Sequence, residues 1–208
     1  MLIRIHVKIP FNQSNSQRLR YTIFMNLDDI NSYIKRVNLA FNEVNQSSVD
    51  KVIYELKQYM ESGARIWVAG NGGSAATASH FATDLSRCKN SKLETIKVIS
   101  LCDNSGLITA IGNDFGFEFI YSRQLSNLAI AGDLLIVLSA SGNSKNILES
   151  LSWAKNNQVK SIALTGFDGG KAKKIADISL HVPTKNGDYG VTEDAHSIIC
   201  HFLASQFR

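Results

Sequence analysis

Two pairs of histidine and carboxylate side chains stand at helical spacings, and such pairs can move protons or bind a metal ion. His80 and Asp84 are four residues apart in a segment of helical periodicity, so both project from one face of the helix. Glu193 and His201 are eight residues apart, which places them roughly 80° apart around a helix axis. Taken singly, each residue is more readily explained as part of a surface pair, a dipole-favouring acid or a buried histidine. Spacing alone leaves both interpretations open.

Two polar loops, each between an apolar run and a helix, have the composition of anion-binding turns. Residues 70–74 read Gly-Asn-Gly-Gly-Ser before a helix over 75–85, and residues 139–144 read Ser-Ala-Ser-Gly-Asn-Ser before a helix that begins near Lys145. Free backbone N–H groups and the positive end of a helix dipole bind anions, and serine hydroxyls add donors. A tight glycine turn and a Ser144 N-cap are the plainer alternatives, but they do not explain three serines in one loop. Because both loops follow strands, we expect them to bind a phosphorylated ligand together.

Short apolar runs alternate with helical segments, and this order defines the fold that must position these residues. Each run is followed by Gly, Ser, Asn or Pro, as is typical of buried parallel strands in βαβ units. Apolar residues at three- and four-residue spacing over 30–44 and 52–60 predict two amphipathic helices before them. The sequence therefore predicts an α/β fold, a three-layer sandwich with a five-stranded parallel sheet preceded by a helical hairpin. The predicted strands span 65–69, 95–101, 134–138, 161–165 and 178–182.

Composition restricts the class of protein. The chain has 208 residues, 44% hydrophobic and 19% charged, which suits one globular domain and excludes a disordered or collagen-like chain. No apolar stretch is long enough for a membrane span. The net charge of +4 is too small and too scattered to indicate a nucleic-acid partner.

Cysteine usage and the first residues bear on the compartment. Cys88, Cys102 and Cys200 form no CxxC pair, which argues against a disulfide framework and a cysteine-based zinc site. The opening residues lack the features of a signal peptide, so we expect a cytoplasmic protein. Residues 1–24 are interpreted as an N-terminal extension, either a strand or disordered, ahead of one domain over 25–208.

A series of motifs in fixed order gives the chain a specific resemblance. They are the loop at 70–74 with His-Phe-Ala at 80–82, Ala-Ile-Gly-Asn-Asp-Phe-Gly at 110–116, the loop at 139–144, Leu-Thr-Gly at 164–166, and a histidine-containing helix after them. From about residue 27 to 208 the chain resembles the sugar isomerase (SIS) domain family, in particular phosphoheptose isomerases. The resemblance implies a flavodoxin-like sandwich and a homotetramer with sites at subunit interfaces. It also implies isomerisation of sedoheptulose 7-phosphate to D-glycero-D-manno-heptose 7-phosphate for surface-polysaccharide heptose synthesis.

The resemblance also implies roles for individual residues. The phosphate would be held by Ser74, Ser139, Ser141 and Ser144, and the sugar site lined by Asn71, Gly72, Gly73, Asn113, Asp114, the Ala140 backbone and Glu193. One Zn²⁺ per subunit would be bound by His80, Asp84, Glu193 and His201. Asp84 and His201 are the candidate acid and base for an enediol pathway, while His196 matches a further family histidine and is assigned a supporting or interface role.

This sequence departs from the family pattern at three of these positions. Ala140 stands where the isomerases commonly have Thr, which removes one hydroxyl but keeps the backbone N–H. Asp84 takes the position of a catalytic Glu, and Glu193 that of a Gln. Both keep oxygen ligands. The shorter acid lengthens the proton-transfer distance, and the added carboxylate favours a metal ion.

Two other functions fit the same fold. One is a non-catalytic SIS protein that binds a phosphosugar or a partner, as does a bacterial replication-initiation regulator. That type lacks the acid and histidine pair, whereas Asp84 and His201 are both present here, which favours an enzyme. The other is a sugar-phosphate-sensing module joined to a DNA-binding domain, but no helix-turn-helix signal or basic arm accompanies this chain.

Overall fold

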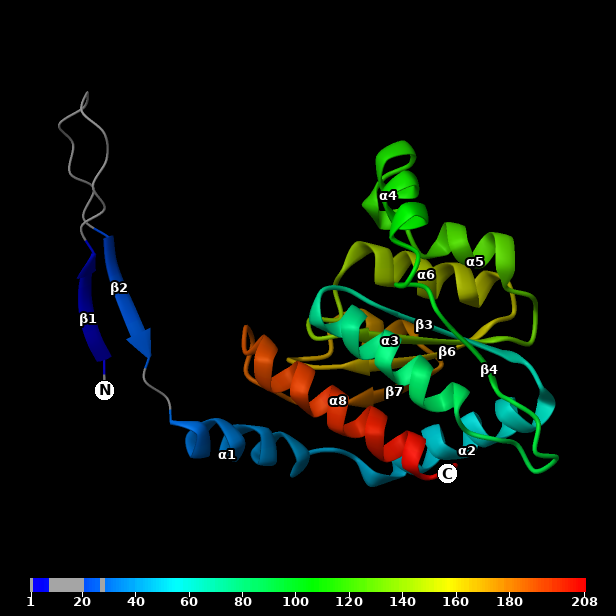
Figure 1. Ribbon diagram of the computed structural model, residues 1–208, viewed down its shortest axis with the longest axis horizontal. Coiled ribbons are helices and arrows are strands. Elements are labelled where there is room, and N and C mark those ends of the chain that lie inside the picture. The colour runs from blue at the N-terminus through cyan, green and yellow to red at the C-terminus, as the bar shows by residue number, and fades with distance from the viewer. Residues whose placement is uncertain (1, 8–20, 27–28) are drawn as a thin grey trace. The chain divides into compact units, whose positions relative to one another are not determined.

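The computed structural model describes residues 2–7, 21–26 and 29–208, which fall into two units, Met1–Arg36 and Val37–Arg208 (Figure 1). In the first unit, β1 (Leu2–Val7) pairs antiparallel with β2 (Tyr21–Asn26), so that Leu2 lies opposite Asn26. A strand was one of the two alternatives for the opening segment. Residues 1, 8–20 and 27–28, in which much of the expected extension falls, lie outside the described residues. The boundary after residue 24 stays a prediction.

The second unit is built on a sheet of five parallel strands in the order β4-β3-β5-β6-β7. Every residue of the central strand β5 is buried, because parallel sheets are covered on both faces. The predicted sheet is confirmed, with strand ends shifted by one or two residues. The strands are β3 (Arg65–Gly70), β4 (Lys97–Ser100), β5 (Leu134–Ser139), β6 (Lys160–Thr165) and β7 (Ile178–His181).

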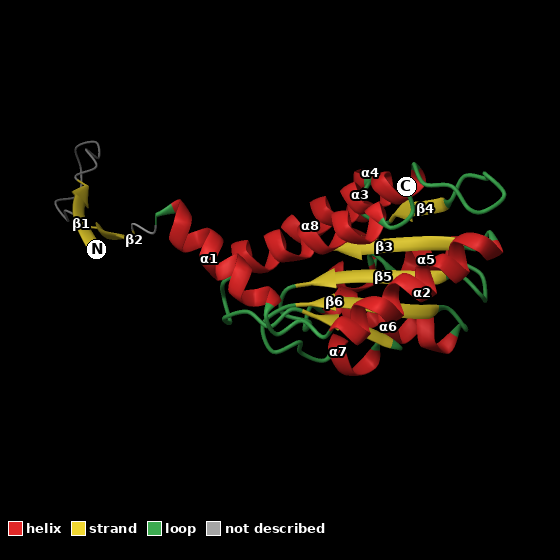
Figure 2. Cartoon of the chain, turned by 90° about the horizontal axis from the view of Figure 1, so that it is seen from below, coloured by secondary structure: helices red, strands yellow, loops and turns green. Residues whose placement is uncertain are grey.

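Helices cover both faces of this sheet (Figure 2). Alternate strand residues such as Trp67, Leu135 and Val137 pack on one face against α4 (Ser105–Asp114), α5 (Ser122–Leu128) and α6 (Lys145–Asn156). The opposite face is covered by α2 (Gln46–Ser62), α3 (Gly73–Ser86) and α8 (Tyr189–Ser205). The layers are completed by the short helices η1 (Phe117–Phe119) and α7 (Ala172–Ile175).

The two helices predicted ahead of the sheet are α1 (Ile30–Phe41) and α2. The Asn45 side chain caps α2 by accepting a hydrogen bond from the Ser48 N–H, and Gly63 ends the helix with a left-handed φ of 73°. Among the described helices, none combines the length and apolarity that a membrane crossing needs.

Helices α3 and α8 lie side by side on the sheet (Figures 1 and 2). Helix α3 carries His80 and Asp84, and helix α8 carries Glu193 and His201. Residues more than 100 positions apart in the sequence therefore come together in one layer of the fold.

Candidate functional site

The first polar loop forms a sharp turn from β3 into α3. A Cβ on Gly70 would stand 2.4 Å from the Ser74 carbonyl oxygen, so only glycine allows the strand to approach the helix so closely. Gly72, with a φ of 54°, precedes the first residue of α3. The turn thus brings Asn71 and Ser74 to the carboxyl edge of the sheet.

The second polar loop connects β5 with α6 and is held by its own serines. Ser139 Oγ accepts a hydrogen bond from the Gly142 N–H at 3.1 Å, and Ser141 Oγ accepts one from the Asn143 N–H at 3.2 Å. Ser144 occupies the N-cap position of α6, yet its side chain makes no capping hydrogen bond. The capping explanation therefore does not account for this hydroxyl.

The two loops enclose a pocket of about 100 Å³. A pocket of this size has room for a phosphoryl group. It is lined by Asn71, Ser74, Leu138, Ser139, Ala140, Ser141, Ser144, Tyr189 and Glu193. A larger hollow of about 240 Å³ lies at the opposite edge of the sheet, where Lys160 is already paired with Glu55 at 2.7 Å. That hollow lacks the serine hydroxyls and helix N-termini that suit an anion.

Glu193 fills the space that Gly73 leaves open at the start of α3. A Cβ on Gly73 would stand 2.1 Å from Glu193 Oε2, so glycine is required here by a carboxylate rather than by a turn. Burial raises the pKa of Glu193, the nearby Asp194 adds to this, and the nearby Ser74 N–H opposes it. The Glu193 carboxylate thus occupies the positive end of the α3 dipole and forms one wall of the pocket.

A reciprocal pair of amides joins the two loops, which sequence reasoning missed. Asn71 and Asn146 each donate a side-chain N–H to the other's carbonyl oxygen at 2.8 Å, and Asn146 is 2% exposed. The Tyr121 hydroxyl donates to the Gly70 carbonyl, and burial raises the pKa of Tyr121 well above its usual value, which keeps it a donor. The only sequence signal was the position of Asn146 at the start of α6.

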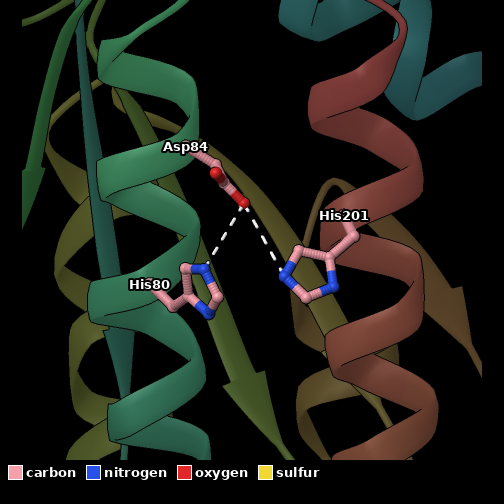
Figure 3. A group of neighbouring side chains, drawn as sticks. All are labelled: His80, Asp84 and His201. Atoms are coloured by element: carbon pink, nitrogen blue, oxygen red, sulfur yellow. Dashed lines mark ion pairs between the residues drawn. The ribbon is translucent and has the colours of Figure 1, made fainter.

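His80, Asp84 and His201 form one cluster between α3 and α8 (Figure 3). Their ligand atoms lie within 4.8 Å of one another, and the Nε2 atoms of His80 and His201 are each 3.8 Å from Asp84 Oδ2. The two imidazole rings meet edge to face, with centroids 4.8 Å apart. The Asp84 carboxylate is buried while both histidines are more than half exposed, so the cluster is open to small solutes. Two imidazoles and a carboxylate can hold a metal ion or exchange protons.

Arg208 contacts the same carboxylate, a pairing that no sequence pattern predicted. Its Nη2 donates to Asp84 Oδ1 at 2.6 Å. Asp84 Oδ2, in contrast, is buried and has no hydrogen-bond partner among the residues that the structure describes. The two oxygens of one carboxylate therefore have different surroundings.

The remaining predicted residues lie away from this cluster. Glu193 is in the serine-lined pocket and not in the group of three. Asn113 and Asp114 end α4, are exposed, and are hydrogen bonded to each other at 2.9 Å, outside the lining of the pocket. His196 is 1% exposed inside α8, in keeping with a supporting role.

Comparison with known proteins gives consistent matches. The SIS domain family matches residues 30–166. A phosphoheptose isomerase of Helicobacter pylori (strain Shi470) is 36% identical over 181 residues, which cover 84% of this chain and 93% of the relative. A probable phosphoheptose isomerase of Thermoplasma volcanium is 32% identical over 88% of this chain and 92% of its own length. The solved structure of a phosphoheptose isomerase from Neisseria gonorrhoeae superposes with a TM-score of 0.76 at 30% identity, over 85% of this chain and 93% of that one.

Proposed function

Because this chain belongs to the SIS domain family and is similar to phosphoheptose isomerases over most of its length, we propose that it converts sedoheptulose 7-phosphate to D-glycero-D-manno-heptose 7-phosphate. The reaction would take place in the cytoplasm, and its product would supply heptose for surface polysaccharide. One observation carries the proposal: a serine-lined pocket and a cluster of acid and imidazole groups share the same two helices, α3 and α8.

The separation of the pocket and the cluster suits a seven-carbon substrate. Glu193 at the pocket and His201 in the cluster are eight residues apart on α8, which corresponds to about 12 Å along the helix axis. An extended seven-carbon chain with a terminal phosphate is on the order of 10 Å long, given bonds of about 1.5 Å. A substrate with its phosphate among the serines would therefore present its first two carbons to the cluster. A three-carbon sugar phosphate would not reach it.

The cluster contains the groups that a ketose to aldose conversion needs. The reaction moves a proton from C1 to C2 through an enediol and a second proton between the two oxygens. In the metal-free protein, Asp84 Oδ2, buried and without a donor among the described residues, suits removal of the carbon-bound proton. His201 Nε2, 3.8 Å away, would give a proton to the adjacent oxygen, and each group can act in either direction.

The donor set also fits a Zn²⁺ ion, one per subunit. Imidazole nitrogens and a carboxylate oxygen are zinc ligands, and the unpartnered Asp84 Oδ2 faces the Nε2 atoms of His80 and His201. When bound, the metal would supply Lewis-acid polarisation of the substrate carbonyl. Glu193 belongs to the proposed ligand set by the family pattern, and it would join only after its carboxylate leaves the backbone of Gly73.

We propose a homotetramer with sites completed at subunit interfaces. Ile198 and Phe202 on α8 are 47% and 45% exposed beside His201, an apolar surface that a second subunit would cover. Asn113 and Asp114, which lie outside the pocket of their own subunit, would then be free to enter a neighbouring site. Sedimentation at micromolar concentration tests the assembly, and a monomer would contradict it.

The decisive experiment is incubation of the purified protein with sedoheptulose 7-phosphate, with and without added Zn²⁺, and NMR of the product. We expect an aldose 7-phosphate, and no conversion of a three-carbon ketose phosphate. Absence of conversion under both conditions would favour the non-catalytic, ligand-binding alternative.

Substitutions at the cluster test the catalytic assignment. We expect Asp84→Asn and His201→Gln to lower turnover by roughly 10²- to 10⁴-fold, the usual contribution of a positioned proton-transfer group. Asp84→Glu restores the family residue, and retained or higher activity would show that the shorter acid is not matched to a different substrate. If Asp84→Asn and His201→Gln both turn over at the parent rate, the assignment is wrong.

A further inference from the structure

The carboxylate of Asp84 is held at one oxygen and free at the other. Oδ1 accepts a hydrogen bond from Arg208 Nη2 at 2.6 Å. Oδ2 has no hydrogen-bond partner among the described residues and lies 3.8 Å from Nε2 of both His80 and His201 (Figure 3). A buried carboxylate oxygen without a donor is costly, so its position between two imidazoles calls for an explanation.

We propose that Arg208 is a positioning residue that makes Asp84 a one-oxygen ligand for a divalent transition metal. This inference rests on the metal site in the proposed function. A carboxylate can bind a metal through one oxygen or through both. With Oδ1 engaged by the planar guanidinium of Arg208, only Oδ2 remains for a metal, and the rotation of the carboxylate is fixed toward the histidines.

Two effects of Arg208 on metal affinity have opposite signs. Its positive charge repels a cation, whereas its hydrogen bond orients the ligand. The Arg208 side chain is 54% exposed, so water screens its charge. Hydrogen-bond partners of metal ligands typically contribute about 10- to 100-fold to affinity. Orientation therefore dominates, and removal of Arg208 should weaken metal binding.

Titration of the full-length, metal-free protein with Co²⁺ tests the inference, because the visible spectrum of Co²⁺ reports the number of ligands. We expect Arg208→Gln to lower Co²⁺ and Zn²⁺ affinity by about 10- to 100-fold. We also expect a weaker visible band, since the released carboxylate can bind through both oxygens. Arg208→Lys keeps the charge and one donor, so its affinity should be intermediate with a spectrum close to that of the parent.

Arg87→Gln is the matched control, since Arg87 is an exposed residue three positions after Asp84 and its backbone, not its side chain, contacts Asp84. We expect this variant to bind Co²⁺ as the parent does. Thermal unfolding checks that every variant is folded. If Arg208→Gln is unfolded, Arg208→Lys must by itself lower the affinity for Co²⁺.

Two results would overturn the inference, and they are distinguishable. If the parent binds Co²⁺ and the Arg208 variants match it in affinity and spectrum, Arg208 does not position Asp84, and the proposed metal site stands. If the parent binds no Co²⁺, the metal site and the role of Arg208 both fail. Conversion of sedoheptulose 7-phosphate by the metal-free protein would then still support the isomerase.

Discussion

Substitution of His196 should remove a large part of the pH dependence of stability. This histidine is 1% exposed within α8, and neither ring nitrogen has a hydrogen-bond partner among the described residues. Burial, with a smaller contribution from the nearby His181, lowers the pKa of His196 to about 4. The nearby Thr165 carbonyl opposes this shift, although it forms no hydrogen bond of normal geometry with the ring. The folded protein therefore keeps this ring neutral.

The sign and size of the effect follow from proton linkage. Between the ordinary pKa of 6.5 and the folded pKa of about 4, the unfolded chain binds a proton at His196 that the folded chain does not. The stability contributed by the neutral ring is thus fully present above pH 6.5 and is lost as the pH falls toward 4. The full difference corresponds to about 3 kcal/mol, most of which is lost by pH 4.5.

Urea unfolding followed by tryptophan fluorescence, at pH 7.5, 5.5 and 4.5 and at one protein concentration, measures this loss. His196→Met removes the titrating ring, and its flexible side chain adapts to the space. The free energy of unfolding of the parent should fall by about 2 to 3 kcal/mol more than that of the variant between pH 7.5 and 4.5. Other titrating groups, including Glu193 with its raised pKa, cancel in this comparison. Equal pH slopes for parent and variant would refute the reasoning.

Three further changes test the pocket. Ser141→Ala with Ser144→Ala should weaken phosphate-sugar binding by about 1 to 3 kcal/mol, and an unchanged KM in the double variant would place the phosphate elsewhere. Asn146→Ala leaves the Asn71 amide in the first loop unpaired, so KM should rise and the free energy of unfolding should fall by about 1 to 3 kcal/mol. Unaltered kinetics in steady-state assays would argue against coupling between the first loop and α6. Gly73→Ala should displace the Glu193 carboxylate and change the free energy of unfolding by less than about 1 kcal/mol, because the lost interaction with the α3 dipole offsets the gain of alanine in a helix. A crystal structure with Glu193 unmoved would contradict this.

The sequence was sufficient to predict the sheet and the two loops because both depend on local patterns. Short continuous apolar runs such as residues 134–138 are typical of buried strands, and the glycines and serines that follow them mark the turns. The placement of His80 and Asp84 on one face of a helix could also be predicted, because helix geometry alone brings residues four apart together.

The other contacts of the site depend on how elements distant in the sequence pack against one another, which no local pattern encodes. Arg208 meets Asp84 across 124 positions of sequence, and Asn71 meets Asn146 across 75. Gly73 was expected to line the sugar site, and in the structure the Glu193 carboxylate lies against its backbone. Such pairings follow from the assembled core and could not be inferred from spacing.

The lengths of the strands bear on how this protein can associate with itself. The edge strands β4 and β7 have four residues each, while the three inner strands have six. Short edges offer few unpaired backbone groups to another chain, and at β4 the exposed Lys97 adds a charge whose ammonium group binds the Gly63 carbonyl. Strand-to-strand growth, the route to fibrous aggregates, is therefore disfavoured at both margins of this sheet. In the proposed homotetramer, subunits would therefore meet through helices rather than through strand edges.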